Sequence, residues 1–134
     1  MVDIKSYSNG QFSWADLQTP SVDGAKKFYS SLFGWDMSDM PTPMGSPYTI
    51  CTMRGQPIVG MGAQPPDMKG APAFWSTYVN VDSVDAIATK VTSNGGKVVM
   101  PAMDVMTQGR MMMLQDPTGA MLGCWQPKSR PQWW

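Results

Sequence analysis

The tripeptide Ser21-Val22-Asp23 returns as Ser83-Val84-Asp85, sixty-two positions later. Each copy follows a short strand-like segment, 12–17 or 74–81, and each begins a stretch whose apolar residues recur at helical spacing. The same offset carries Gly34, a helix-ending glycine, onto Gly96. Because the repeat keeps both the start and the length of a helix, we interpret it as an internal duplication of a βαβββ unit.

The remaining elements follow from turn and cap signals. Thr19 and Pro20 are typical of an N-cap and a first helical residue, and Ser83 of the second N-cap. The second helix would end at Asn94-Gly95-Gly96, and the stretch 37–47 reads as a loop. Further strands are expected at 48–53 and 57–63, joined as a hairpin through 54–56, and at 97–100, 110–115 and 120–126.

The predicted fold class is therefore α+β, one domain over residues 1–134 made of two βαβββ modules. Module one covers about 11–63 and module two about 73–127, with a Pro- and Gly-rich linker at 64–72. The C-terminal tail, 128–134, is expected to be loose or to dock on a partner through Trp133-Trp134.

Strand alternation assigns residues to two faces of the sheet. Small or branched apolar residues suit the face covered by the helices: Ala15, Leu17, Thr77, Val79, Val81, Leu122 and Cys124. The opposite face mixes aromatic, thioether and polar groups: Phe12, Trp14, Asp16, Ser76, Tyr78, Asn80, Met121, Gly123 and Trp125. Such a mixture is typical of a ligand cleft, which needs apolar walls and a few polar anchors.

The inventory of side chains excludes several chemistries. The chain has no histidine, and every acidic residue is aspartate, so Ser-His and Cys-His nucleophilic mechanisms are excluded. Asp16 and Asp104 remain as candidate bases, and either would need its pKa raised by burial to work near neutral pH. Ten basic residues balance ten acidic ones, which argues against a nucleic-acid partner. Cys51 and Cys124 lack CxxC spacing and are expected to be buried free thiols.

No run of eighteen apolar residues occurs, and the first eleven residues lack the apolar region of a signal peptide. We therefore expect a cytoplasmic protein with no membrane partner.

Three segments together resemble the vicinal oxygen chelate superfamily, which includes glyoxalase I, the extradiol dioxygenases and the bleomycin-resistance proteins. They are FSWADLQTP with GAKKFYSSLFGW, STYVNVDSVDAIATKVTSNGGKV, and GRMMMLQDPTGAMLGCWQP, and the resemblance covers roughly 11–127. It implies two βαβββ modules whose strands form a cupped mixed sheet around a cleft.

In metal-dependent members of that superfamily, His and Glu from equivalent strands hold the ion. Those positions fall here on Trp14, Met61, Ser76 and Gly123, none of which suits a divalent metal. The resemblance therefore implies the metal-free, bleomycin-resistance-like branch, with no cofactor.

The fourteen methionines supply soft, adaptable contact surface. If the turn after 109–115 pairs Gln115 with Ala120, Met112 lies opposite Gly123 and borders the vacant metal position. The predicted ligand-binding residues are Trp14, Asp16, Met61, Ser76, Tyr78, Met112, Met121, Gly123 and Trp125. Core filling by Trp14, Trp125 or the methionines, and pairing of Asp16 with Arg110, remain open as alternatives.

The function expected from these residues is binding or sequestration of a small, weakly charged aromatic or apolar molecule, by a protein of the drug-resistance type. A homodimer is expected, because clefts of this family often lie near a two-fold interface. Two alternatives stay open: an enzyme that uses Asp as acid or base, and a protein-interaction or ligand-sensing module.

Overall fold

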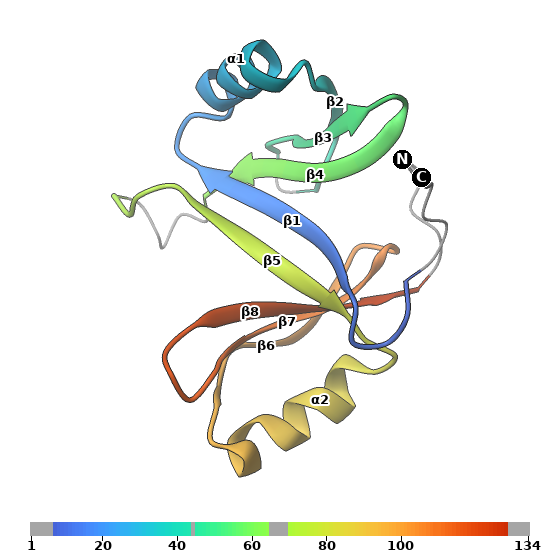
Figure 1. Cartoon of the computed structure of the whole chain (residues 1–134), viewed down its shortest axis with the longest axis vertical. Helices are drawn as coiled ribbons and strands as arrows, with labels where there is room; N and C mark the ends of the chain where they lie inside the picture. The colour runs from blue at the N-terminus through green and yellow to red at the C-terminus, as the bar shows by residue number, and fades with distance from the viewer. Residues whose placement is uncertain (1–6, 44, 65–69, 129–134) are drawn as a thin grey trace. The chain divides into compact units, whose positions relative to one another are not determined.

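The computed structural model describes residues 7–43, 45–64 and 70–128. The fold is α+β, as expected, with eight strands and two α-helices (Figure 1). The chain divides into two compact units. The first unit is Trp14–Ser76, and the second comprises residues 7–13 and 77–128 among those described. The tail, whose docking was expected, lies outside the described residues from 129 onward.

The first unit carries helix α1 on one face of its strands (Figure 1). Its elements are β1 (Phe12–Thr19), α1 (Val22–Phe33), β2 (Asp36–Met40), β3 (Tyr48–Met53) and β4 (Gln56–Ala63). The strand order is β2-β3-β4-β1, with β1 parallel to β4 and the other pairs antiparallel. The core consists of Leu17, Cys51 and Met61, against which Val22, Ala25 and Tyr29 of α1 pack. Leu17 therefore faces the helix, as alternation predicted.

The second unit repeats this plan. Its elements are β5 (Phe74–Asn80), which enters this unit at Thr77, α2 (Val84–Val91), a 3₁₀ turn (Thr92–Asn94), β6 (Lys97–Val105), β7 (Gly109–Gln115) and β8 (Met121–Pro127). The order is β5-β8-β7-β6, with β5 parallel to β8. The core consists of Val81, Val84, Val91, Met112 and Cys124.

Both helices begin at the repeated serine. Ser21 Oγ accepts from the Gly24 N–H at 3.3 Å and Ser83 Oγ from the Ala86 N–H at 3.1 Å. The expected cap at Thr19 is wrong, because Thr19 ends β1 and is buried there. The left-handed residues that end the two helical segments are Gly34, at φ 73°, and Gly95, at φ 86°. Gly95, and not Gly96, is thus the counterpart of Gly34.

Strand β2 was not expected, since Asp36–Met40 reads as loop. It forms because it pairs with β3 over its whole length and because Asp39 is held at both oxygens. Thr49 Oγ1 donates to Asp39 Oδ1 at 2.6 Å, and Lys26 Nζ donates to both oxygens at 3.1 Å. The predicted hairpin is confirmed, with its turn formed by Arg54 and Gly55 at φ 55° and 76°.

Among the described residues, neither α-helix has the length and apolar content that a membrane crossing requires.

Candidate functional site

One face of the second unit carries a row of thioethers. Met113 lies opposite Gly123 and Met111 opposite Trp125 across β7 and β8, while Gln115 pairs with Met121. Met100 and Met103 of β6 lie opposite Met113 and Met111. Residues directly paired across strands point to the same side of a sheet. These positions form what we call the methionine face: Met100, Met103, Met111, Met113 and Met121.

Three members of the methionine face are open to solvent. Met100 is 36% exposed, Met103 46% and Met121 48%, whereas Met113 is 9% exposed. Trp125 adjoins this row as the partner of Met111, and its indole covers Gly109, where a Cβ would lie 2.5 Å from Trp125 Cζ2. The face therefore combines flexible sulfur groups with one indole ring.

Met112 does not belong to this face. The expected pairing of Gln115 with Ala120 is wrong by one residue, so Met112 pairs with Cys124 and is fully buried in the core beside α2. The cause is the turn: Asp116 Oδ1 accepts from the N–H groups of Thr118 at 2.8 Å and Ala120 at 3.0 Å. Ala120 is thereby retained in the turn, and the strand begins at Met121.

Asp116 also accepts from the Thr118 hydroxyl at 2.6 Å. That bond, with the backbone donors of the same turn, holds the pKa of Asp116 below its ordinary value. The carboxylate is thus kept in the charged form that the turn requires.

The space expected beside Gly123 is filled by Tyr78. The two residues are paired on β5 and β8, and a Cβ at Gly123 would lie 2.4 Å from Tyr78 Cδ2. Tyr78 is 6% exposed, so its ring is buried against Gly123 and occupies the space beside that residue. Gly123 lacks a side chain and so allows the Tyr78 ring to pack against its backbone, which leaves no room there for a ligand.

The first unit has a matching arrangement. Asp16 pairs with Gly60 on parallel strands, and the Tyr48 ring lies over Gly60, where a Cβ would overlap its hydroxyl. Since Asp16 corresponds to Tyr78, the counterpart of Gly123 is Gly60 and not Met61. The offset between the repeats is therefore sixty-three at this strand, one more than at β1.

Met61 points the other way, into the core with Leu17 and Cys51, and is fully buried. Its expected place on the ligand face is wrong. Ser76, 9% exposed, lies on β5 two residues before Tyr78, so the two share a face as expected.

Tyr48 joins the two first-strand residues that sequence analysis selected. Trp14 Nε1–H donates to the Tyr48 hydroxyl at 2.9 Å, and that hydroxyl donates to Asp16 Oδ2 at 3.4 Å. Tyr48 was missed by sequence analysis. The signal that could have found it is the alternation Gly60-Met61-Gly62 within a strand, which indicates close approach of a bulky neighbour.

Arg110 forms ion pairs with Asp85 and Asp104 and not with Asp16. It donates to both oxygens of Asp85 at 2.9 and 3.0 Å and to Asp104 at 3.3 Å. Lys128 pairs with Asp104 at 3.0 Å and, with Arg110, lowers the pKa of that carboxyl. A general base at neutral pH needs the opposite shift, which disfavours Asp104 in that role.

The four residues at the superfamily's metal-ligand positions, with Gly60 in place of Met61, are not suitable metal ligands. Trp14, Gly60, Ser76 and Gly123 supply neither imidazole nitrogen nor carboxylate oxygen. Within the described parts of the chain, no group of three or more Cys or Asp side chains could hold a metal ion. The residues present therefore do not fit the divalent metal of the superfamily.

Comparison with known proteins defines the family. The glyoxalase/bleomycin resistance protein/dioxygenase superfamily matches residues 11–123, and the chain belongs to it. A methylmalonyl-CoA epimerase from Mycobacterium tuberculosis has the same fold, with a TM-score of 0.67 at 14% identity, over 96% of this chain and 95% of that one. Hypothetical protein BH1468 from Bacillus halodurans gives 0.71 at 10% identity, over 93% and 99%.

The relatives found by sequence similarity are longer than this chain. Putative glyoxylase CFP32 of Mycobacterium tuberculosis is 46% identical over 122 residues, which cover 90% of this chain and 47% of that protein. Anthracycline biosynthesis protein DnrV of Streptomyces peucetius is 31% identical over 132 residues, covering 90% and 48%. The chain thus spans about half the length of these relatives.

Proposed function

We propose that this chain binds a flat, weakly charged aromatic molecule on the methionine face, without a metal. The observation that carries the proposal is the gathering of five thioethers on one side of the second unit, with Met100, Met103 and Met121 36%, 46% and 48% exposed. Exposed apolar side chains gathered on one side of a sheet are a feature of ligand and partner surfaces.

Methionine suits such a ligand for two reasons. Its unbranched side chain repacks around different shapes, and each sulfur gains roughly 0.3–1.5 kcal/mol against an aromatic ring. The balance of ten basic and ten acidic residues gives no long-range attraction for a strongly charged ligand. A planar molecule of low charge therefore fits this face best.

The name of one of the relatives fits this ligand class, whereas CFP32 is named a putative glyoxylase. DnrV of Streptomyces peucetius is named for anthracycline biosynthesis, and anthracyclines carry a flat aromatic ring system. We propose a ligand of that shape for this chain, held in the manner of a drug-resistance binding protein.

Calorimetric titration with a neutral anthraquinone tests the proposal. We expect saturable binding to the wild-type chain and a loss of affinity of about tenfold or more in Met103→Lys and Met121→Lys, because a charge interrupts the apolar face. Met106→Lys is the matched control, since Met106 is equally exposed at 46% but lies in the turn after β6. Absence of binding, or equal losses in all three variants, would contradict the proposal.

A second candidate function is acid-base catalysis in the first unit. The observation that favours it is the hydrogen-bonded series from Trp14 through Tyr48 to Asp16, in which a phenol proton lies next to a carboxylate. Deuterium exchange into a 1,3-diketone probe provides the test. Wild type should exchange the acidic C–H faster than Asp16→Asn and Tyr48→Phe, and equal rates would remove this candidate.

A further inference from the structure

Strand β6 is irregular in a way that turns two methionines to the same side of the sheet. Met100 lies opposite Met113 and Met103 opposite Met111, although the β6 residues are three positions apart and the β7 residues two. In a regular strand, residues three apart point to opposite sides, so the register shift between Met100 and Met103 is what brings them onto one face. We call these four residues the thioether quartet.

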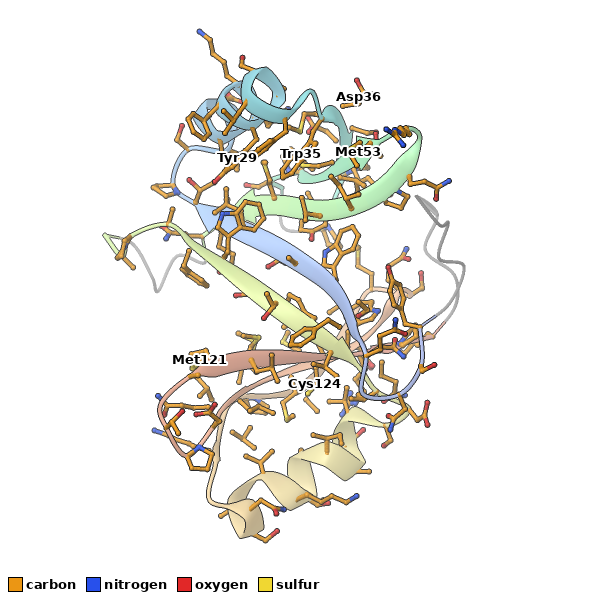
Figure 2. All side chains as sticks on the ribbon, viewed as in Figure 1. Tyr29, Trp35, Asp36, Met53, Met121 and Cys124 are labelled. Carbon is orange, nitrogen blue, oxygen red and sulfur yellow. The ribbon has the colours of Figure 1, made fainter. Side chains whose placement is uncertain are left out.

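The neighbours of the quartet show which side it occupies. Val98 and Ala102 pack against the core beside α2, and a second register shift separates Val98 from Met100. On β8, Met121 and Cys124 are labelled in Figure 2; they are three residues apart and point to opposite sides, with Cys124 in that core. The quartet therefore lies on the side of the second unit that α2 does not cover.

The pairing allows sulfurs of both strands to reach one ion. Directly opposed residues on neighbouring strands have Cβ atoms about 5 Å apart, and each methionine sulfur is carried beyond its Cβ on rotatable bonds. Met100 and Met103 are 36% and 46% exposed and can turn their sulfurs towards those of Met113 and Met111. An ion can enter from solvent past the two exposed members.

The donor atoms decide which ion fits. Thioether sulfur is a soft ligand, and soft ligands select Cu(I) over harder ions such as Mg²⁺ or Ca²⁺. Because uncharged donors do not neutralise a bound ion, a monovalent ion loses less on leaving water than a divalent one does. The residues that β7 and β8 pair on this side are all uncharged: Gly109, Met111, Met113, Gln115, Met121, Gly123, Trp125 and Pro127.

We propose that the thioether quartet is a binding site for Cu(I), coordinated by sulfur atoms of both β6 and β7. The site uses residues other than the four at the superfamily's metal-ligand positions, and it takes a soft monovalent ion where those positions suit no divalent one. It does not rest on the aromatic ligand proposed above. Because Met100 and Met103 serve both, Cu(I) and an aromatic molecule should compete for this face.

Methyl NMR with silver(I), a redox-stable ion of the same charge and softness, tests the site. In a chain labelled with ¹³C-methyl methionine, silver nitrate in chloride-free buffer should shift the four quartet signals and saturate at a single equivalent. Met106, 46% exposed in the turn after β6, is the internal control, and its signal should stay in place. Zinc(II) should shift none of these signals. Quartet signals that do not move with silver(I) would overturn the proposal.

The buried thiols are the competing sites for silver, and neighbouring methionines report on them. Cys51 Sγ lies 3.3 Å from Met37 Sδ, and Cys124 pairs with Met112. Silver at the thiols would therefore shift the signals of Met37 and Met112. Shifts confined to these two residues would place the ion in the cores and overturn the proposal.

Native mass spectrometry tests the ligands with copper itself, added without oxygen as the acetonitrile complex of Cu(I). Met100→Leu and Met111→Leu each remove one sulfur while nearly conserving volume, and their circular dichroism spectra should match wild type. Wild type should retain a single copper ion, and each variant should bind it about tenfold or more weakly. Met106→Leu is the matched control and should bind as wild type does. Equal retention by all four chains would overturn the proposal.

The two ligands of this face are tested separately. Silver and copper are titrated into the chain without an anthraquinone, and the anthraquinone is titrated without metal. A chain that binds the anthraquinone but neither ion would overturn the Cu(I) site alone. A chain that binds Cu(I) through the quartet but no anthraquinone would overturn the proposed aromatic ligand alone.

Discussion

Tyr78 rests its ring directly on Gly123, its neighbour on the parallel strand, and Tyr48 does the same on Gly60 in the other repeat. In both units a tyrosine therefore occupies the space above the glycine that marks the family's last-strand ligand position. The consequence is that a ligand of the second unit is expected on the methionine face beside this ring, and not in a hollow beneath it.

The Tyr78–Gly123 contact predicts a coupled effect on stability. Gly123→Ala should destabilise the chain by roughly 1–3 kcal/mol, because the added methyl forces the Tyr78 ring out of place. In a Tyr78→Ala background the same substitution should cost much less, since nothing then occupies that space. Urea unfolding of the four chains checks this, and an undiminished effect of Gly123→Ala in the double variant would contradict the contact.

Four carboxylates set the response of the fold to acid. The pKa values of Asp39, Asp85, Asp104 and Asp116 are all lowered, chiefly by hydrogen bonds from Thr49, Arg110, Lys128 and Thr118 respectively. A lowered folded-state pKa contributes stability that is present above the unfolded value, about 3.9, and is lost as the pH falls through the folded value.

We therefore expect urea midpoints that stay constant from about pH 7 to 5, where no histidine titrates, and that fall below about pH 4. Asp116→Asn should lower the midpoint at pH 7 and reduce its fall in acid. A midpoint that increases as the pH is lowered from 5 to 3 would contradict these assignments.

Both cysteines are buried free thiols, as predicted. Burial raises the pKa of Cys51 to about 11 and also raises that of Cys124, so neither forms a thiolate near neutral pH. The native chain should react slowly with Ellman's reagent at pH 8, and two thiols should react at once after unfolding in urea. Rapid labelling of the native chain would show that one core opens readily.

Element types were largely predictable from the sequence, because they depend on local signals. The Ser83 cap, the Arg54-Gly55 turn and the alternation that places Leu17 toward the helix all act within a few residues. Strand β2 was not predictable in this way, since its polar residues are stabilised by partners on α1 and β3.

The candidate site was predictable only in part. A one-residue change in pairing reverses the side to which every residue of a strand points, and Asp116 fixes that pairing through backbone donors that sequence patterns do not reveal. Sequence analysis therefore placed Met61, Met112 and Met121 on one face of the sheet. The pairing of the strands instead places Met100, Met103, Met111 and Met113 with Met121. Tyr48 was missed because its partners are thirty-two and thirty-four residues away along the chain.

Binding of the ligand to the methionine face can be measured residue by residue with methyl NMR. In a chain labelled with ¹³C-methyl methionine, titration with a neutral anthraquinone should shift the signals of Met100, Met103 and Met121 to saturation. The signals of Met61 and Met112, buried in the two cores, should stay in place. Signals of the methionine face that do not move at saturating anthraquinone, or shifts confined to Met37 and Met53 of the first unit, would show that the ligand does not bind to the methionine face.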